Sequence, residues 1–123
     1  MGKREEFARR RLDLNEKVLR RATLGIKRFW NLDEQTYHAG ALDAKTKELL
    51  GLASSLVLRC EDCVTYHLVQ AHEKGASGAE IMETLQVALV VGGSIVIPHM
   101  RRAVELLEQL EQHTEQKQSQ KMP

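Results

Sequence analysis

The chain has 123 residues, of which 42% are hydrophobic, 28% are charged and only 4% are aromatic, with a formal net charge of +1. This size and composition predict one folded domain and exclude a disordered chain. Because aromatic residues are so few, the core must be built from Leu, Val, Ala and Ile, which favours packed helices over a β-sandwich.

The distribution of charge argues against a nucleic-acid partner. The basic clusters Arg9-Arg10-Arg11 and Arg20-Arg21 alternate with acidic residues, which is typical of a solvated helix rather than of a phosphate-binding stripe. The N-terminus lacks the apolar segment of a secretory signal. The most apolar run, residues 87–97, is roughly half as long as a membrane-spanning helix. We therefore expect a cytoplasmic protein that binds neither nucleic acid nor membrane.

The first 42 residues are expected to form an N-terminal helical extension. A charged helix is predicted from Gly2 to about Arg21, where sparse apolar residues recur at near-helical spacing. The segment 23–40 is less regular, and here we predict only a short helix at 31–37 between two loops.

Residues 43–112 are expected to form the motif-bearing helical core. Four helices are predicted, over residues 44–58, 60–74, 78–91 and 94–113. Asp43 is a suitable N-cap, Gly75 a suitable terminator, and Ser77 with Glu80 has the spacing of a capping box. Residues 113–123 are expected to fray. The chain as a whole, 1–123, is predicted to be a single-domain all-α bundle of about five to six helices.

Both cysteines, Cys60 and Cys63, lie at the start of a predicted helix. The unpaired N–H groups of a first helical turn stabilise a thiolate. A pair at this spacing can close to a disulfide with little backbone movement, so the sequence indicates a reversible two-electron couple. In a reducing cytoplasm a permanent staple is not expected. The alternatives are a pair of buried structural thiols and a metal half-site that lacks a fourth ligand.

His67 follows Cys63 by one helical turn on the same face, within reach of a thiol–imidazole hydrogen bond. Glu48 lies in an apolar run of the preceding helix, and its carboxylate can approach His67 if the two helices pack antiparallel. A carboxylate, an imidazole and a thiol in a row form a proton relay that activates a nucleophile. The alternatives are a satisfied core histidine at position 67 and a surface glutamate that pairs with Lys45 or Lys47.

The combined spacing of Glu48, Cys60, Cys63 and His67 resembles the active-site motif of alkyl hydroperoxidase D and its relatives in the carboxymuconolactone decarboxylase superfamily. The segment 90–99 is similar to the small single-domain members of that superfamily. The resemblance covers about residues 43–110. It implies an all-helical fold and a homo-oligomer, commonly a trimer or a hexamer.

The resemblance also implies a thiol-dependent peroxidase that needs no cofactor or metal. Cys63 would attack a hydroperoxide and become a sulfenic acid, Cys60 would resolve it as a disulfide, and an external dithiol reductant would restore both. Glu48 and His67 would relay the proton. Asp62 replaces a histidine of the alkyl hydroperoxidase, and its carboxylate disfavours a neighbouring thiolate. The alternatives are a lactone decarboxylase, which needs no cysteine pair, and a non-enzymatic redox sensor.

Overall fold

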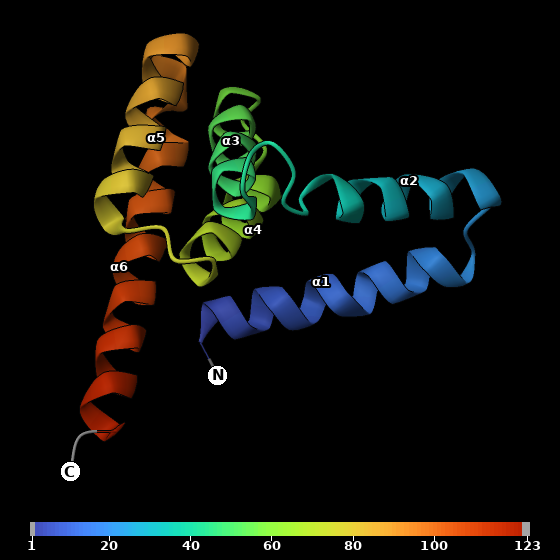
Figure 1. Cartoon of the computed structure of the whole chain (residues 1–123), viewed down its shortest axis with the longest axis horizontal. Coiled ribbons are helices and arrows are strands. Elements are labelled where there is room, and N and C mark those ends of the chain that lie inside the picture. The colour runs from blue at the N-terminus through green and yellow to red at the C-terminus, as the bar shows by residue number, and fades with distance from the viewer. Residues whose placement is uncertain (1, 122–123) are drawn as a thin grey trace. The chain divides into compact units, whose positions relative to one another are not determined.

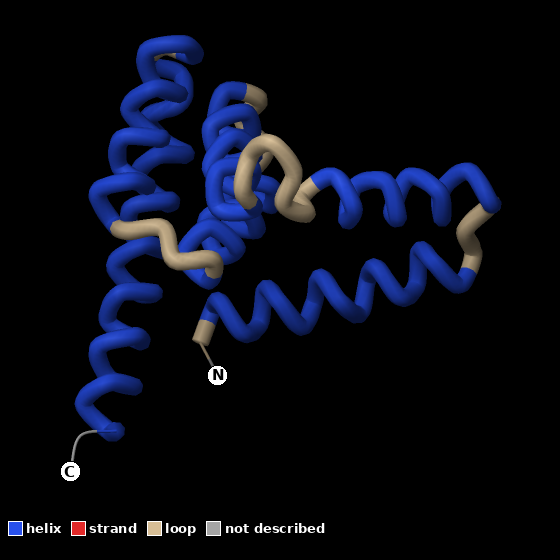
Figure 2. Tube along the Cα trace, in the orientation of Figure 1, coloured by secondary structure: helices blue, strands red, loops and turns tan. Residues whose placement is uncertain are grey.

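Residues 2–121 are described by the structure, a computed structural model. Contacts divide the chain into two compact units, the first ending at His38 and the second beginning at Ala39. Every regular element in the described range is helical (Figure 2), which confirms the predicted all-α class. No helix in this range combines the length and the hydropathy needed to cross a membrane.

The first unit consists of helices α1 (Lys3–Arg20) and α2 (Leu24–Thr36), neither of which contains a buried residue. The bounds of α1 agree with the prediction. The short helix predicted at 31–37 is wrong, because α2 begins at Leu24. Thr23 is the reason, since its side-chain oxygen accepts the Ile26 N–H at 3.4 Å and so satisfies a donor of the first turn.

The second unit contains five helical elements, α3 (Ala44–Val57), α4 (Glu61–Glu73), α5 (Gly78–Gly92), the 3-10 turn η1 (Ser94–Val96) and α6 (Ile97–Lys121). Helix α3 packs against α4 and α5, and α4 also packs against α6 (Figure 1). The apolar stripes of these helices meet in one core, whose largest fully buried apolar side chains are Leu52, Leu56, Leu68, Ile81, Leu85 and Leu110. This core holds α3 and α4 side by side.

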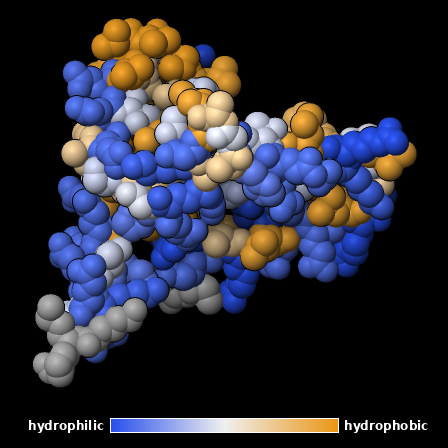
Figure 3. Space-filling model, in the orientation of Figure 1, coloured by the Kyte–Doolittle hydropathy of each residue, from blue (hydrophilic) through white to orange (hydrophobic). Residues whose placement is uncertain are grey.

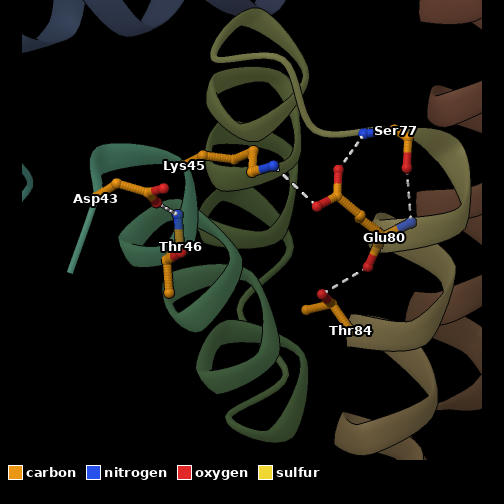
Figure 4. Close-up of polar contacts among 6 residues, drawn as sticks. All are labelled: Asp43, Lys45, Thr46, Ser77, Glu80 and Thr84. Atoms are coloured by element: carbon orange, nitrogen blue, oxygen red, sulfur yellow. Dashed lines mark hydrogen bonds and ion pairs between the residues drawn. The ribbon is translucent and has the colours of Figure 1, made fainter.

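Local capping explains where α3 and α5 begin. The Asp43 carboxylate accepts the Thr46 N–H at 2.7 Å, which also lowers the pKa of Asp43. Ser77 and Glu80 form the predicted capping box (Figure 4). The Ser77 hydroxyl accepts the Glu80 N–H at 3.1 Å, and the Glu80 carboxylate accepts the Ser77 N–H at 2.9 Å. Both predicted starts are therefore confirmed.

The connection between α3 and α4 is a tight turn that reverses the chain. The Cys60 N–H donates to the Ser55 carbonyl at 3.1 Å, and the Arg59 N–H donates to the Leu56 carbonyl at 3.0 Å. This is the Schellman pattern, whose left-handed position is here occupied by Arg59 at φ 58° instead of the usual glycine. Cys60 consequently follows the end of α3 and is at the same time the N-cap of α4.

Helix α6 is longer than predicted. The expected end near His113 is wrong, and the expected fraying is wrong for residues 113–121, because α6 continues to Lys121. Thr114 ties this part of α6 to α4, since its hydroxyl lies 3.1 Å from Nε2 of His72. The rest of the expected frayed tail, Met122 and Pro123, lies outside the described residues.

An ion pair joins the starts of α3 and α5. Nζ of Lys45 lies 2.9 Å from Oε2 of Glu80 (Figure 4). The pKa of Glu80 is lowered because its carboxylate accepts the Ser77 N–H and the Lys45 ammonium. The pKa of Lys45 is raised because its ammonium donates to Glu80. Both charged forms are thus favoured in the folded state.

We predict that Lys45→Met lowers the free energy of unfolding most near neutral pH. A carboxyl with a lowered folded pKa stabilises the fold above its unfolded pKa, and this contribution is lost as the pH falls through the folded value. For Lys45 the contribution is lost as the pH rises through its raised pKa. Urea unfolding at acidic, neutral and alkaline pH should show the variant and the wild type converging at both extremes. A difference between them that stays constant with pH would contradict this, and Lys27→Met on exposed α2 is the control.

Candidate active site

Helices α3 and α4 bring Glu48 and His67 into contact. Oε2 of Glu48 lies 3.1 Å from Nδ1 of His67, which is the contact expected if the two helices pack antiparallel. Glu48 is only 1% exposed. The alternative of a surface glutamate paired with Lys45 or Lys47 is therefore wrong, and Lys45 instead pairs with Glu80.

The Glu48 carboxylate also has a lysine ammonium near it. Nζ of Lys74, the residue that caps the end of α4, lies 3.9 Å from Oε1 of Glu48. Burying a carboxylate without partners costs several kcal/mol. Within residues 2–121 no buried side-chain nitrogen or oxygen lacks a hydrogen-bond partner, so Glu48 is accommodated by its neighbours rather than by solvent.

Glu48 also determines how the imidazole can act. An ionised Glu48 can only accept, so Nδ1 of His67 is the donor in this contact and Nε2 is the ring nitrogen that Glu48 does not engage. Tyr66 packs edge-on against the same ring, with centroids 5.2 Å apart. His67 is thus held from its Nδ1 side by a carboxylate, as the imidazole is in nucleophile-activating relays.

Gly51 makes room for this imidazole. A Cβ at position 51 would lie 2.8 Å from Nδ1 and 2.9 Å from Cε1 of His67, closer than side chains tolerate. Sequence reasoning missed this residue. The signal was a glycine inside a helix, which costs about 0.5–1 kcal/mol relative to alanine and therefore indicates a close approach. It lies three residues after Glu48, on the same face of α3.

Cys60 and Cys63 form a disulfide with their Cα atoms 5.2 Å apart. Both residues are half-buried, which disagrees with a pair of buried structural thiols. The Cys63 N–H lies 3.3 Å from Sγ of Cys60, so the helix start donates a hydrogen bond to this sulfur. Cys63 and His67 are one turn apart on the same face of α4, and Asp62 between the cysteines is exposed.

The described part of the chain contains no group of three or more His, Cys, Asp or Glu side chains placed to hold a metal ion. The chemistry available at these residues is proton transfer and thiol–disulfide exchange.

A second carboxylate–imidazole contact lies at the start of α4, and sequence reasoning missed it as well. The Glu61 carboxylate is bonded both to Nδ1 of His99 and to the Arg102 guanidinium. His99 and Arg102 are one turn apart in α6. The sequence separations of 38 and 41 residues leave no local signal for these contacts.

Comparison with solved structures shows where this fold has been seen. Two crystal structures of a Thermotoga maritima protein, 58% and 57% identical in sequence, superpose with TM-scores of 0.89 and 0.87. They match 91% of this chain and 98% and 95% of their own chains. That protein is described as a carboxymuconolactone decarboxylase family member with a possible involvement in antioxidative response. An apo family protein from Legionella pneumophila, 28% identical, has a TM-score of 0.74 and is matched over 91% of this chain and 97% of its own.

Sequence comparison points to the same family. An uncharacterized protein of the cox locus of Paracoccus denitrificans is 30% identical over 83 residues, which are 68% of this chain and 75% of that protein. The model of the carboxymuconolactone decarboxylase family matches residues 26–106. This range includes both cysteines and the Glu48–His67 and Glu61–His99 contacts. The chain therefore belongs to the carboxymuconolactone decarboxylase family.

Proposed function

We propose that this protein is a thiol-dependent peroxidase and disulfide oxidoreductase, which reduces hydroperoxides at the Cys60–Cys63 pair with electrons from an external dithiol. The observation that carries the proposal is Glu48, which is buried and bonded to His67 on the helix that also bears both cysteines. The description of the Thermotoga maritima relative as possibly involved in antioxidative response supports it.

In the first half of the proposed cycle, Cys63 reacts with the peroxide. His67 removes the thiol proton through Nε2 while Glu48 stabilises the imidazolium from the Nδ1 side. The Cys63 thiolate attacks one peroxide oxygen and the O–O bond breaks. Cys63 becomes a sulfenic acid, and the departing alkoxide takes the proton from His67 and leaves as an alcohol.

In the second half, Cys60 resolves the sulfenic acid. Its sulfur accepts the Cys63 N–H at the helix start, a contact that favours the thiolate form. The Cys60 thiolate attacks the sulfur of Cys63, the S–S bond forms, and hydroxide leaves and is protonated to water. The external dithiol then exchanges with the disulfide, supplies two electrons and two protons, and becomes a disulfide itself.

The dithiol distinguishes this proposal from its alternatives. Lactone decarboxylation does not require a redox-active cysteine pair, so it leaves Cys60 and Cys63 without a role. A redox sensor would use the same pair, but it would be oxidised once per chain. An enzyme consumes many equivalents of peroxide as long as the dithiol reductant is supplied, and this turnover number separates the two.

We expect Cys63→Ser to abolish peroxide consumption because it removes the attacking thiol. Cys60→Ser should leave a sulfenic acid at Cys63 that cannot be resolved. Trapping with dimedone followed by peptide mass spectrometry locates the modified residue, and wild-type protein with excess reductant is the control. Adducts found on Cys60 in the Cys63→Ser variant, with peroxide still consumed, would reverse the two roles.

Glu48→Gln is expected to slow peroxide reduction by roughly 10- to 100-fold, because an amide stabilises the His67 imidazolium less than a carboxylate does. Disulfide formation by a small-molecule oxidant should still occur. The measurement is the pH–rate profile of peroxide consumption, with Glu83→Gln, an exposed glutamate of α5, as the matched control. An unchanged profile in Glu48→Gln would remove Glu48 from the proposed relay.

Gly51→Ala should displace the His67 ring and lower peroxidase activity while the cysteines remain able to pair. The added methyl group would overlap with Nδ1 and Cε1, so we expect a loss of about 1–3 kcal/mol in the free energy of unfolding. Gly25→Ala is the control, because the nearest atom to its Cβ would be 3.9 Å away. Full activity and a raised stability in Gly51→Ala would show that the ring is not held by this contact.

A further inference from the structure

The residue that follows Cys60 carries a negative charge that is held from another helix. Glu61 is the first residue of α4, and its carboxylate bonds Nδ1 of His99 and the Arg102 guanidinium, both from α6. These contacts take no part in the proposed Glu48–His67 relay. Any effect of these contacts on the cysteine pair is exerted through the Glu61 carboxylate.

A carboxylate beside a thiol disfavours the thiolate, because it repels the negative charge that forms on sulfur. Glu61 is adjacent in sequence to Cys60, whose sulfur accepts the Cys63 N–H. That N–H contact favours the thiolate, whereas an uncompensated Glu61 would oppose it. The Arg102 guanidinium bonded to Glu61 opposes this repulsion.

An apolar surface lies at this end of the second unit. The end of α5 lies against the end of α3, since a Cβ at Gly92 would be 3.6 Å from Cγ2 of Val57. Over the end of α5 and the start of α6 the surface is strongly hydrophobic (Figure 3). Exposed apolar side chains near this end of the unit are Leu58, Val90, Val91 and Ile95. The ion pair itself is open to solvent, with the Glu61 side chain 40% and the Arg102 side chain 61% exposed, so we expect its effect on the sulfur to be modest.

Few other charges face the cysteines from the described elements. Residues 84–96, which form most of α5 and all of η1, include no charged side chain. Glu48 of α3 is compensated by His67 and Lys74. The remaining charged residues at this end are Arg59 in the α3–α4 turn, exposed Asp62 in α4 and exposed Arg101 in α6.

We propose that Arg102 and His99 are positioning residues that control the ionisation of Cys60 by neutralising Glu61. In the step concerned, the Cys60 thiol releases its proton to solvent and becomes the thiolate. In the full couple, the Cys60–Cys63 disulfide takes two electrons and two protons from an external dithiol, which is itself oxidised to a disulfide. The inference rests on the proposed redox role of the cysteine pair and does not require a peroxide as the oxidant.

The test compares Glu61→Gln with Arg102→Gln. In a Cys63→Ser background, the absorbance of the thiolate at 240 nm reports the titration of Cys60 alone. Glu61→Gln removes the repelling charge, so the midpoint should fall by about half a pH unit. Arg102→Gln leaves that charge less compensated, so the midpoint should rise by a similar amount, a roughly threefold change in thiolate below the midpoint. The double variant should return close to the parent.

The opposite signs separate an electrostatic role from a structural one. If both variants shift the midpoint in the same direction, or if neither does, the proposal is overturned. Arg101→Gln is the matched control, because it removes a neighbouring positive charge that is not bonded to Glu61 and should therefore shift the midpoint by less than Arg102→Gln does. His99→Gln should raise the midpoint by less than Arg102→Gln does, because a guanidinium always carries its charge whereas an imidazole can bond the Glu61 carboxylate without one.

A second readout uses the native cysteine pair. Equilibration with glutathione buffers should show the dithiol form more populated in Glu61→Gln and less populated in Arg102→Gln than in the wild type. Neither readout depends on peroxide consumption. If the wild-type protein consumes no peroxide but the two variants shift in opposite directions, the proposed peroxidase is refuted and this inference stands. If the wild-type protein consumes peroxide but the variants do not shift in opposite directions, the peroxidase stands and this inference is refuted.

Discussion

The contact between Glu48 and His67 is the interaction on which the rest of this site depends. It places a carboxylate that is 1% exposed against an imidazole on a neighbouring helix. Such a contact survives only if the helices pack closely and each polar atom has a partner. Gly51 provides the space for the ring, and the Lys74 ammonium lies 3.9 Å from the other carboxylate oxygen. A carboxylate that is costly to bury is thus held in place by several neighbouring residues.

The turn that follows α3 links this contact to the cysteines. Arg59 adopts the left-handed conformation that reverses the chain, and the next residue, Cys60, caps α4. The same few residues therefore make α3 and α4 antiparallel and place a sulfur at the helix start. The imidazole and the dithiol share α4, so their relative positions follow from helix geometry alone. Only the carboxylate has to be supplied by packing.

Two carboxylate–imidazole contacts thus flank the cysteine pair, and their surroundings differ. The contact of Glu48 is buried in the core, where a charge is costly and a proton can be passed without competition from water. The contact of Glu61 is more exposed and includes a guanidinium, which keeps its charge at any physiological pH. The first arrangement suits proton transfer, and the second suits a steady electrostatic influence on the neighbouring sulfur.

The local chemistry of the sequence was enough to predict most of the helices. Asp43, Gly75 and the capping box of Ser77 and Glu80 act over three or four residues, so their effect can be read without knowledge of the fold. The start of α2 was missed because only Thr23 marks it, and the segment that follows Thr23 is less regular in sequence than the other predicted helices. The end of α6 was missed because a contact with another helix extends it.

For the site, the sequence by itself determined which reactive groups lie together on α4, since Cys60, Cys63 and His67 follow one another at intervals of about one helical turn. It placed Glu48 beside His67 only on the condition that α3 and α4 run antiparallel, which the tertiary structure met. Tertiary structure alone decided that Glu48 is buried and that Glu61 pairs with α6. The physical reason is distance along the chain, because contacts between residues 19 to 41 positions apart depend on how whole helices pack and leave no mark in local spacing.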